Sequence, residues 1–473
     1  MTRRFTVVAL AALLGGCMVG PNYERPDMPL PQRFPEDAAS AEAPVAPVPP
    51  DWWTLYRDPL LDDLVASARA ANPDVAQAVA RVQEAEATLR AANASIIPEI
   101  DLNANAGRQA LTNASPTPRV ISGMGFTLST AYELDFWGRL RRGIESAQQN
   151  LFASQYGRDV VDWALVAGTT QAYFTLRALD ALIRVTRESL VSFDASVDLT
   201  RRRAEGGVAS DLDVRQAEVQ RQVARVALAD LVRQRAVALH QLQSLTARLD
   251  LVVPAGDLES LPVPALPPPG LSSTLLERRP DVRQAEALLA AQNARIGVAR
   301  AAMFPTISLT GDYGGQSTSL GTLLAAPGRI WSIGFGLALP LFDAGRRRAV
   351  TELEEARTRE AVAAYQRAVQ NAFRDVQDAL SNVRQYQDAA EDVRLRVEAA
   401  DAAVRLSQRR YEAGYSAYLE VLIAQRALYE AQTGAVQNRQ ALMLASVDLM
   451  KALGGGWDPA SAVVASPASR RSD

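Results

Sequence analysis

The stretch EAGYSAYLEV, residues 412–421, repeats the plan of an earlier stretch, EGGVASDLDV, residues 205–214. Gly207 matches Gly414 at an offset of 207 residues, and a leucine, an acid and a valine follow at the same offset. Each phrase interrupts a long helical pattern. Glycine commonly ends a helix in the left-handed conformation, and a serine near the next helix start can cap exposed amides. We therefore predict the turn of a long helical hairpin twice, with turn residues Gly207, Ser210 and Leu212 in the first copy and Gly414, Ser416 and Tyr418 in the second.

The same offset extends well beyond the two turns. Residues 73–107 align without gaps on residues 280–314, and the matches include proline, glycine and aspartate. Such matches indicate an internal duplication. The predicted parts are a first structural repeat at 51–253, a Pro-rich linker at 254–271 and a second structural repeat at 272–455.

Each repeat is expected to contain a helix, a pair of strands and the long helical hairpin. The strand pairs are predicted at about 99–134 and about 306–341, where apolar and polar residues alternate. The helix–strand switches are predicted at Pro98, Pro305, Gly138 and Gly345, because proline cannot continue a helix.

Strands of this length and alternation are typical of transmembrane barrels, although a soluble hairpin packed on a helix is the alternative. Four strands per chain cannot close a barrel, and open edges are not tolerated in lipid. Two copies would give eight strands and three would give twelve. The number of long helices favours three, because twelve helical segments can surround a pore.

Residues 346–412 contain neither proline nor glycine. Between 376 and 411 the apolar or small residues alternate in steps of three and four apart from one extra step of three, which is the pattern of a coiled-coil seam. A helix of roughly 65 residues would be about 100 Å long.

The N-terminus begins with two arginines and an apolar run that is too short to span a bilayer. This layout predicts a signal peptide at 1–16. The run ends in LLGGC, which resembles a bacterial lipobox with Cys17 as the lipidated residue, carrying acyl chains such as palmitate. An ordinary signal peptide with an incidental cysteine is the alternative. Residues 17–50 are then expected to be a lipidated leash, and residues 456–473 a disordered tail.

Composition excludes several classes of function. The formal net charge is −3, so the chain lacks a basic footprint for nucleic acid. One histidine, His240, and one cysteine cannot build a zinc site or a thiol catalytic pair. No nucleophile–base set or phosphate-binding loop is present. We expect no enzyme activity, no metal and no cofactor other than the covalent lipid on Cys17.

Several motifs together resemble the outer-membrane efflux factors, the TolC/OprM-like family, in its lipoprotein (NodT-type) branch. They are VGPNYERP, DWWTLYRDPLLDDLVASARAANPDV, ELDFWGRLRR, LPLFDAGRRR and RYEAGYSAYLEVLIAQRALYEAQ. The resemblance implies an α+β membrane protein: a homotrimer with a twelve-stranded outer-membrane β-barrel, four strands per chain, continued by a long periplasmic α-helical barrel.

The resemblance also implies a function and partners. The chain would be the passive outer-membrane duct of a tripartite efflux pump of a Gram-negative bacterium, exporting drugs or other small solutes. Its partners would be a periplasmic adaptor protein and an inner-membrane pump of the RND type. A duct for type I protein secretion and a lipid-anchored coiled-coil scaffold without a pore are the alternatives.

The resemblance places the two hairpin turns at the periplasmic tip, where the channel narrows and the adaptor docks. Leu419 matches the family's constriction leucine, but Ile423 stands where relatives have an acid. Because these two residues are four apart, they share one helix face. Three copies would form an apolar gate, and Asp211 and Asp213 of the first hairpin are the acidic alternative. Ordinary packing inside the hairpin is the competing explanation for Leu419 and Ile423.

Overall fold

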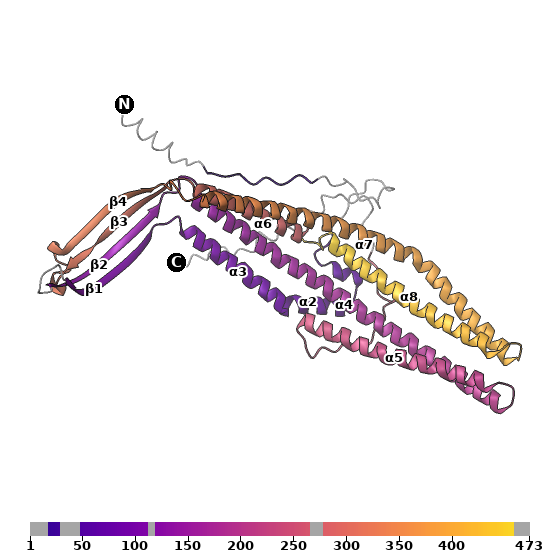
Figure 1. Ribbon diagram of the computed structural model, residues 1–473. Helices are drawn as coiled ribbons and strands as arrows, with labels where there is room; N and C mark the ends of the chain where they lie inside the picture. Colours follow the sequence, from indigo (N-terminus) through magenta and orange to yellow (C-terminus); the bar gives the residue numbers. More distant parts are fainter. Residues whose placement is uncertain (1–17, 29–47, 112–118, 265–277, 458–473) are drawn as a thin grey trace. The chain divides into compact units, whose positions relative to one another are not determined.

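The computed structural model describes residues 18–28, 48–111, 119–264 and 278–457. Both repeats have the same order of elements: a helix, two strands and two long helices (Figure 1). In the first repeat these are α3 (Pro73–Ala94), β1 (Glu99–Leu111), β2 (Arg119–Glu133), α4 (Arg139–Glu205) and α5 (Asp211–Thr246). In the second they are α6 (Pro280–Ala301), β3 (Thr306–Ser317), β4 (Arg329–Ala338), α7 (Arg346–Glu412) and α8 (Tyr418–Ala452).

Short elements complete the chain. Before α3 lie a 3-10 helix, η2 (Trp52–Tyr56), and α2 (Pro59–Ala71). Between β3 and β4 lie η4 (Leu320–Thr322) and η5 (Ala326–Gly328). The chain divides into two compact units, and each unit is drawn from both repeats. The first unit contains the sheet, residues 80–155 and 284–367 and the segment ending at Met28, and the second contains the rest, including both hairpin turns.

The four strands form one antiparallel sheet in the order β1-β2-β3-β4 (Figure 1). The register pairs Leu102 with Leu128 and Leu128 with Tyr313, so the apolar residues of neighbouring strands lie on one face. The central pair, β2 with β3, joins the two repeats. Within the described residues β1 and β4 each have only one partner strand, so both are edges of the sheet.

The apolar face of the sheet is exposed to an unusual degree. Trp331 is 71% exposed, Ile333 76% and Ile100 71%. The opposite face is polar, and there the Ser332 hydroxyl donates to Asp312 Oδ2 at 2.7 Å. No described helix covers the apolar face, so the soluble hairpin packed on a helix is wrong for this sheet. The predicted alternation is confirmed.

The helix–strand switches lie where proline and glycine predict them. Pro98 precedes β1 directly, and Pro305 precedes β3. Gly138 and Gly345 have φ angles of +76° and +84° and stand immediately before α4 and α7. Positive φ costs a side-chain-bearing residue energy, which explains why glycine occupies both positions.

Carboxylates cap the two long helices at these switches. Asp135 accepts the backbone amides of Leu140 and Arg141 at 3.1 and 3.0 Å. Asp343 accepts the amides of Gly345 and Arg347, both at 3.1 Å, which lowers the pKa of its carboxyl. Each long helix therefore starts with its exposed amide groups paired and with negative charge at the positive end of its dipole.

The first described residues run beside the switch into α4. The Val19 amide donates to the Trp137 carbonyl at 3.1 Å. A Cβ on Gly138 would lie 2.9 Å from the Met18 side chain, and one on Gly297 would lie 2.7 Å from Arg142. The segment that follows Cys17 is therefore packed tightly against the start of α4. Cys17 itself lies outside the described residues.

The core of the second unit is formed by residues of α2, η2, α4, α5 and α8. Trp52, Tyr56, Tyr173 and Phe174 are its large aromatic residues, all at most 2% exposed. The Tyr56 hydroxyl lies 2.7 Å from Ser446 Oγ on α8. His240 is exposed on α5.

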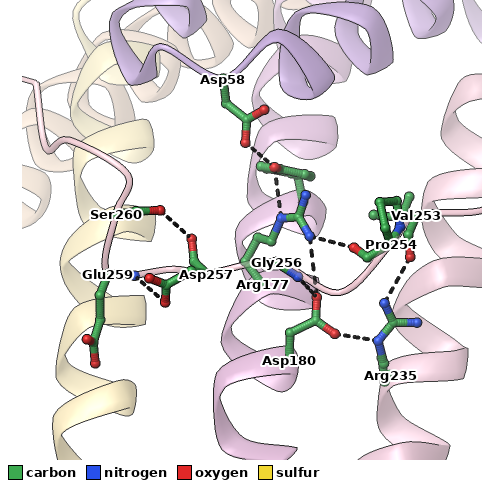
Figure 2. Close-up of polar contacts among 11 residues, drawn as sticks. Asp58, Arg177, Asp180, Arg235, Val253, Pro254, Gly256, Asp257, Glu259 and Ser260 are labelled. Atoms are coloured by element: carbon green, nitrogen blue, oxygen red, sulfur yellow. Dashed lines mark hydrogen bonds and ion pairs between the residues drawn. The ribbon is translucent and has the colours of Figure 1, made fainter. Parts of the chain in front are cut away.

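The predicted Pro-rich linker, 254–271, starts as an ordered segment held by buried charges (Figure 2). Arg177 on α4 donates to the Pro254 carbonyl at 2.7 Å. Asp180, one turn further along α4, accepts the Gly256 amide at 3.1 Å. A Cβ on Gly256 would collide with the Arg177 guanidinium, so any larger residue there would displace Arg177 from this network. This network fastens the connection between the repeats to the first hairpin.

The coiled-coil seam predicted along α7 is confirmed. Apart from Ala390, every position of the 376–411 pattern is buried or half-buried, and Val383 is fully buried. Among the described residues, none of the helices is both long and apolar enough to span a membrane.

Candidate functional site: the tips of the two helical hairpins

The two hairpin turns share one backbone geometry. Gly207 has a φ of +73° and Gly414 a φ of +80°. In the first turn the Val208 amide donates to the Arg203 carbonyl at 2.9 Å, and in the second the Tyr415 amide donates to the Arg410 carbonyl, also at 2.9 Å. The Gly207 amide also donates to the Ala204 carbonyl, and the Gly414 amide to the Tyr411 carbonyl, so both helices end in a Schellman motif. The prediction of a left-handed glycine cap is confirmed twice.

The helices that follow the turns start differently. Ser210 caps α5: its hydroxyl accepts the Asp213 amide, and the Asp213 carboxylate accepts the Ser210 amide, both at 3.3 Å. This reciprocal pair is a capping box. In the second hairpin Ala417 occupies the cap position and makes no side-chain bond. The expectation that Ser416 caps α8 is wrong, because Ser416 lies one residue too early and its buried hydroxyl has no hydrogen-bond partner.

Buried tyrosines hold the second turn in place. Tyr418 is 1% exposed and Tyr411 4%, and their rings meet edge to face at 5.6 Å. Burial raises the pKa of Tyr418 to about 12, so the phenol stays neutral at physiological pH. The cluster that surrounds them draws on all four long helices and contains Val197, Ala217, Tyr411, Tyr418 and Val421.

Polar contacts also join the two hairpins. The Arg203 guanidinium at the end of α4 lies 4.6 Å above the Tyr411 ring and donates to the Glu412 carbonyl at 3.1 Å. Gln425 on α8 donates to Ser192 and Ser196 on α4 at 3.0 and 2.9 Å. The first hairpin therefore holds the second through one cation–π contact and several hydrogen bonds.

The predicted gate residues lie on the outside of this cluster. Leu419 is 49% exposed and Ile423 60%, whereas their neighbours Tyr418 and Val421 are buried. Ordinary packing inside the hairpin is therefore wrong for Leu419 and Ile423. On the first hairpin Leu212, the counterpart of Leu419, is 64% exposed.

The two acids of the first hairpin have different surroundings. Asp213 is engaged in the capping box, so its carboxylate serves the start of α5. Asp211, the first residue of α5, is exposed. Of the two acidic candidates for the gate, Asp211 is the one that the local structure leaves at the surface.

Sequence reasoning missed Arg203 and Gln425. The internal offset of 207 places Arg203 opposite Arg410 and Gln425 opposite Glu218, so the repeat alone marked both positions as equivalent to polar tip residues. Their contacts across the hairpins depend on how α4 packs on α8. Among the described residues no group of three or more candidate ligands could hold a metal ion.

Known proteins match this chain along nearly all of its length. A family model described as outer membrane efflux protein matches residues 64–248 and 271–455, two segments separated by the internal offset. The toluene efflux pump outer membrane protein TtgC of Pseudomonas putida is 36% identical over 469 residues, covering 97% of this chain and 96% of that protein. The outer membrane protein OprJ of Pseudomonas aeruginosa is 34% identical over 465 residues, covering 97% of each.

A solved structure agrees with these relatives. The outer-membrane channel OprN superposes with a TM-score of 0.87 at 28% identity, covering 94% of this chain and 100% of that one.

Proposed function

The chain belongs to the outer membrane efflux protein family, and we propose that it is the outer-membrane duct of an efflux pump, gated at the tips of its two hairpins. The observation that carries this proposal is the four-stranded sheet, whose apolar face is exposed and whose two edges lack partner strands among the described residues. In water such a face would aggregate, whereas in a bilayer it meets hydrocarbon chains.

The unpaired edges of the sheet determine how the chains must assemble. A sheet within lipid must close on itself, because unpaired backbone groups there cost several kcal/mol each. Three chains with four strands each close a twelve-stranded barrel. The polar face, which carries Asp312 and Ser332, then lines a water-filled passage. This arrangement places the protein in the outer membrane as a homotrimer, with its helices in the periplasm.

The N-terminus supports a lipid anchor at Cys17. Met18 and Val19 pack beside Gly138, at the point where the sheet gives way to α4. A lipid carried by the preceding residue would start next to the membrane-facing sheet. The anchor would thus hold the chain in the same membrane as the barrel.

Cargo and partners follow from the family. Relatives are named as toluene and antibiotic efflux pump components, so we expect small molecules such as drugs or toxic solutes as the cargo here. A periplasmic adaptor protein and an inner-membrane pump of the RND type would complete the system. The exposed residues of the turns, among them Leu212 and Tyr415, offer the adaptor a contact surface.

The gate is formed by Leu419 and Ile423 from three chains. An apolar ring can stop ion flow by excluding water from a narrow passage, without being physically sealed. The contacts of Arg203 with Tyr411 and Glu412 keep the second hairpin against the first and so hold the ring narrow. If Asp211 lined the constriction instead, the closed state would attract cations.

Single-channel conductance in planar bilayers tests the proposal. We compare the wild type with Leu419→Ala/Ile423→Ala and use Leu212→Ala, the equivalent leucine of the first hairpin, as the matched control. We expect rare, small openings in the wild type and in the control, and long, large openings in the double variant.

Each contrary outcome has a definite meaning. If the wild type already conducts freely, the gate assignment is wrong and the duct remains. If Leu212→Ala opens the channel as well, the gate is not specific to the second hairpin. If inserted protein never conducts in any variant, the duct is wrong and the scaffold without a pore takes its place.

A further inference from the structure

An open pocket of about 600 Å³ lies close to the sheet, where α3 and α6 end and where α4 and α7 begin. All of its lining residues belong to the first compact unit. Volumes in this range are typical of sites that hold drug-sized molecules. Most of the lining is apolar or small, so the pocket suits an apolar body. The apolar and small residues include Ala92, Gly143, Ala147, Val298, Ala299 and Ala302.

The two repeats contribute equivalent positions to this pocket, so it lies on the same face of both. The repeats differ there in charge, because the first has the neutral Thr88 where the second has the cationic Arg295. The pairs of lining residues that stand 207 apart are Thr88 with Arg295, Ala92 with Ala299, Gly143 with Val350, and Ala147 with Glu354.

Three charged residues line the pocket, and two of them are already paired. Arg139 donates to both carboxylate oxygens of Glu133, at 2.9 and 2.6 Å. Glu354 accepts from Arg357 at 2.8 Å. The third, Arg295, is exposed and makes no hydrogen bond or ion pair within the described part of the chain. Its guanidinium is therefore available to pair with an anionic group in the pocket.

The pocket lies on the side of α6 that faces away from the N-terminal segment, residues 18–28. On the covered side Glu286 pairs with Arg25 at 2.7 Å, and Asn293 donates to the Pro21 carbonyl at 3.1 Å. At 3.6 residues per turn, the pocket residues of α6 point on average about 180° away from Glu286 and Asn293. The segment and the pocket therefore occupy opposite faces of this helix. The pocket residues of α6 are Arg295, Val298, Ala299 and Ala302.

This placement turns the pocket toward the passage. The lipid proposed on Cys17 reaches the bilayer only if the segment that follows it runs along the outside of the ring of helices. The opposite face of α6 then borders the water inside the ring. The pocket is therefore open to solutes that pass through the duct, on the periplasmic side of the barrel, and each chain of the trimer supplies one.

We propose that this pocket binds transported solutes that combine an apolar body with an anionic group such as a carboxylate or a sulfonate. The anionic group pairs with Arg295, whose planar guanidinium can donate two parallel hydrogen bonds to such an anion. The apolar body lies on Ala92, Val298 and Ala299, where it loses contact with water. The inference rests on the duct and on the lipid anchor proposed above, and it adds a preference among the solutes that the duct carries.

Protection of an introduced thiol tests the site in the full-length trimer, reconstituted in lipid nanodiscs. Val298→Cys places a thiol in the pocket, one helical turn from Arg295, and its reaction with N-ethylmaleimide is followed by mass spectrometry. The first probe is octanesulfonate. Octyltrimethylammonium has the same chain length and the opposite charge, and ethanesulfonate has the same charge without a long chain.

Two background substitutions separate the local charge from the net charge. Arg295→Thr introduces the residue that the first repeat has at this position. The matched control, Arg348→Thr, removes an arginine of α7 whose side chain is 83% exposed and does not line the pocket. The wild type gives the background reaction of Cys17, and Ala302→Cys repeats the measurement from a second lining position if Val298→Cys fails to assemble.

We expect octanesulfonate to slow the reaction of Val298→Cys several-fold and the two other probes to leave it unchanged. The protection should persist with Arg348→Thr and disappear with Arg295→Thr. Equal protection by octyltrimethylammonium overturns the proposal, as does protection that survives Arg295→Thr or the absence of any protection. A thiol that does not react even without a probe also overturns it, because another copy of the chain would then cover the pocket.

Conductance of the same variants in planar bilayers tests the duct separately. Channels that conduct but show no protection leave the duct intact and remove only the binding site. Inserted protein that does not conduct, even with the gate substitutions Leu419→Ala/Ile423→Ala, removes the duct itself.

Discussion

The two hairpin turns have the same backbone geometry but are stabilised by different kinds of contact. Both end their first helix in a Schellman motif on a glycine of positive φ. The first turn then stabilises itself locally, through the capping box of Ser210 and Asp213. The second has no side-chain cap and relies on the buried Tyr411 and Tyr418.

Residues at equivalent positions of the two hairpins differ in the same way. The offset of 207 places exposed Asp211 opposite buried Tyr418, and Glu218 opposite Gln425. Local hydrogen bonds persist when a hairpin moves, whereas tertiary contacts are lost as soon as it separates from its neighbour. We therefore expect the second hairpin, which bears the proposed gate residues, to be the one that leaves its packed position.

Tyr418→Ala should produce the largest difference between the hairpins. Removing a large buried aromatic side chain typically costs about 3–5 kcal/mol. We expect this loss in the local stability of the second turn, read from amide hydrogen exchange, together with more frequent channel opening. Asp211→Ala, at the equivalent position, should cost less than about 1 kcal/mol, as expected for an exposed first-turn acid. Equal effects in the two turns would contradict the contrast.

Substitutions at the two helix-cap positions should change the stability of the turns by an intermediate amount, with opposite signs in the two hairpins. Ser210→Ala removes a capping box and should destabilise the first turn by about 0.5–2 kcal/mol. Ala417→Ser introduces a hydroxyl at the matching position and should stabilise the second turn by about 1 kcal/mol, or somewhat less. Hydrogen exchange of the first turn of α5 and of α8 measures both. If Ala417→Ser also slows channel opening, the missing cap is part of the gate's mobility.

Acidification should produce the smallest effect, and only through the first hairpin. Hydrogen bonds from Arg201 and Arg215 lower the pKa of Glu218 from its usual 4.5. A carboxyl with a lowered folded pKa contributes stability above its unfolded pKa and loses it as the pH falls through the folded value. Opening frequency should therefore rise below about pH 4.5 more steeply in the wild type than in Glu218→Gln. Identical pH profiles would show that this ion pair does not hold the tip.

Much of the fold follows from local chemistry and was predictable. Pro98, Pro305, Gly138 and Gly345 end and start elements because their backbone preferences hold in any surroundings. The strand pairs follow from period-two alternation, and the observed strands end within three residues of the predicted bounds. Ser416 was misjudged because two serines at slightly different positions look alike until the helix start is known to a single residue.

The hairpin tips were less predictable. The exposed Leu419 and Ile423 and the buried Tyr418 and Val421 all belong to one largely apolar stretch. A sequence does not say which side of a helix its neighbours cover. Arg203 meets Tyr411 only because the ends of α4 and α7 come together, some 200 residues apart along the chain. Gln425 is distinguished from any surface glutamine only by the serines of α4 beneath it.

The sequence by itself determined the duplication, the order of elements in each repeat, the two glycine turns and the alternating faces of the strands. These features depend on backbone preferences and on short-range periodicity, and residues that are neighbours in the sequence determine both. The tertiary structure decided which side chains at the tip are buried and which hairpin is stabilised by its own local contacts. Those properties depend on contacts between α4, α5, α7 and α8, and burial is set by the packing of segments that are distant in the chain.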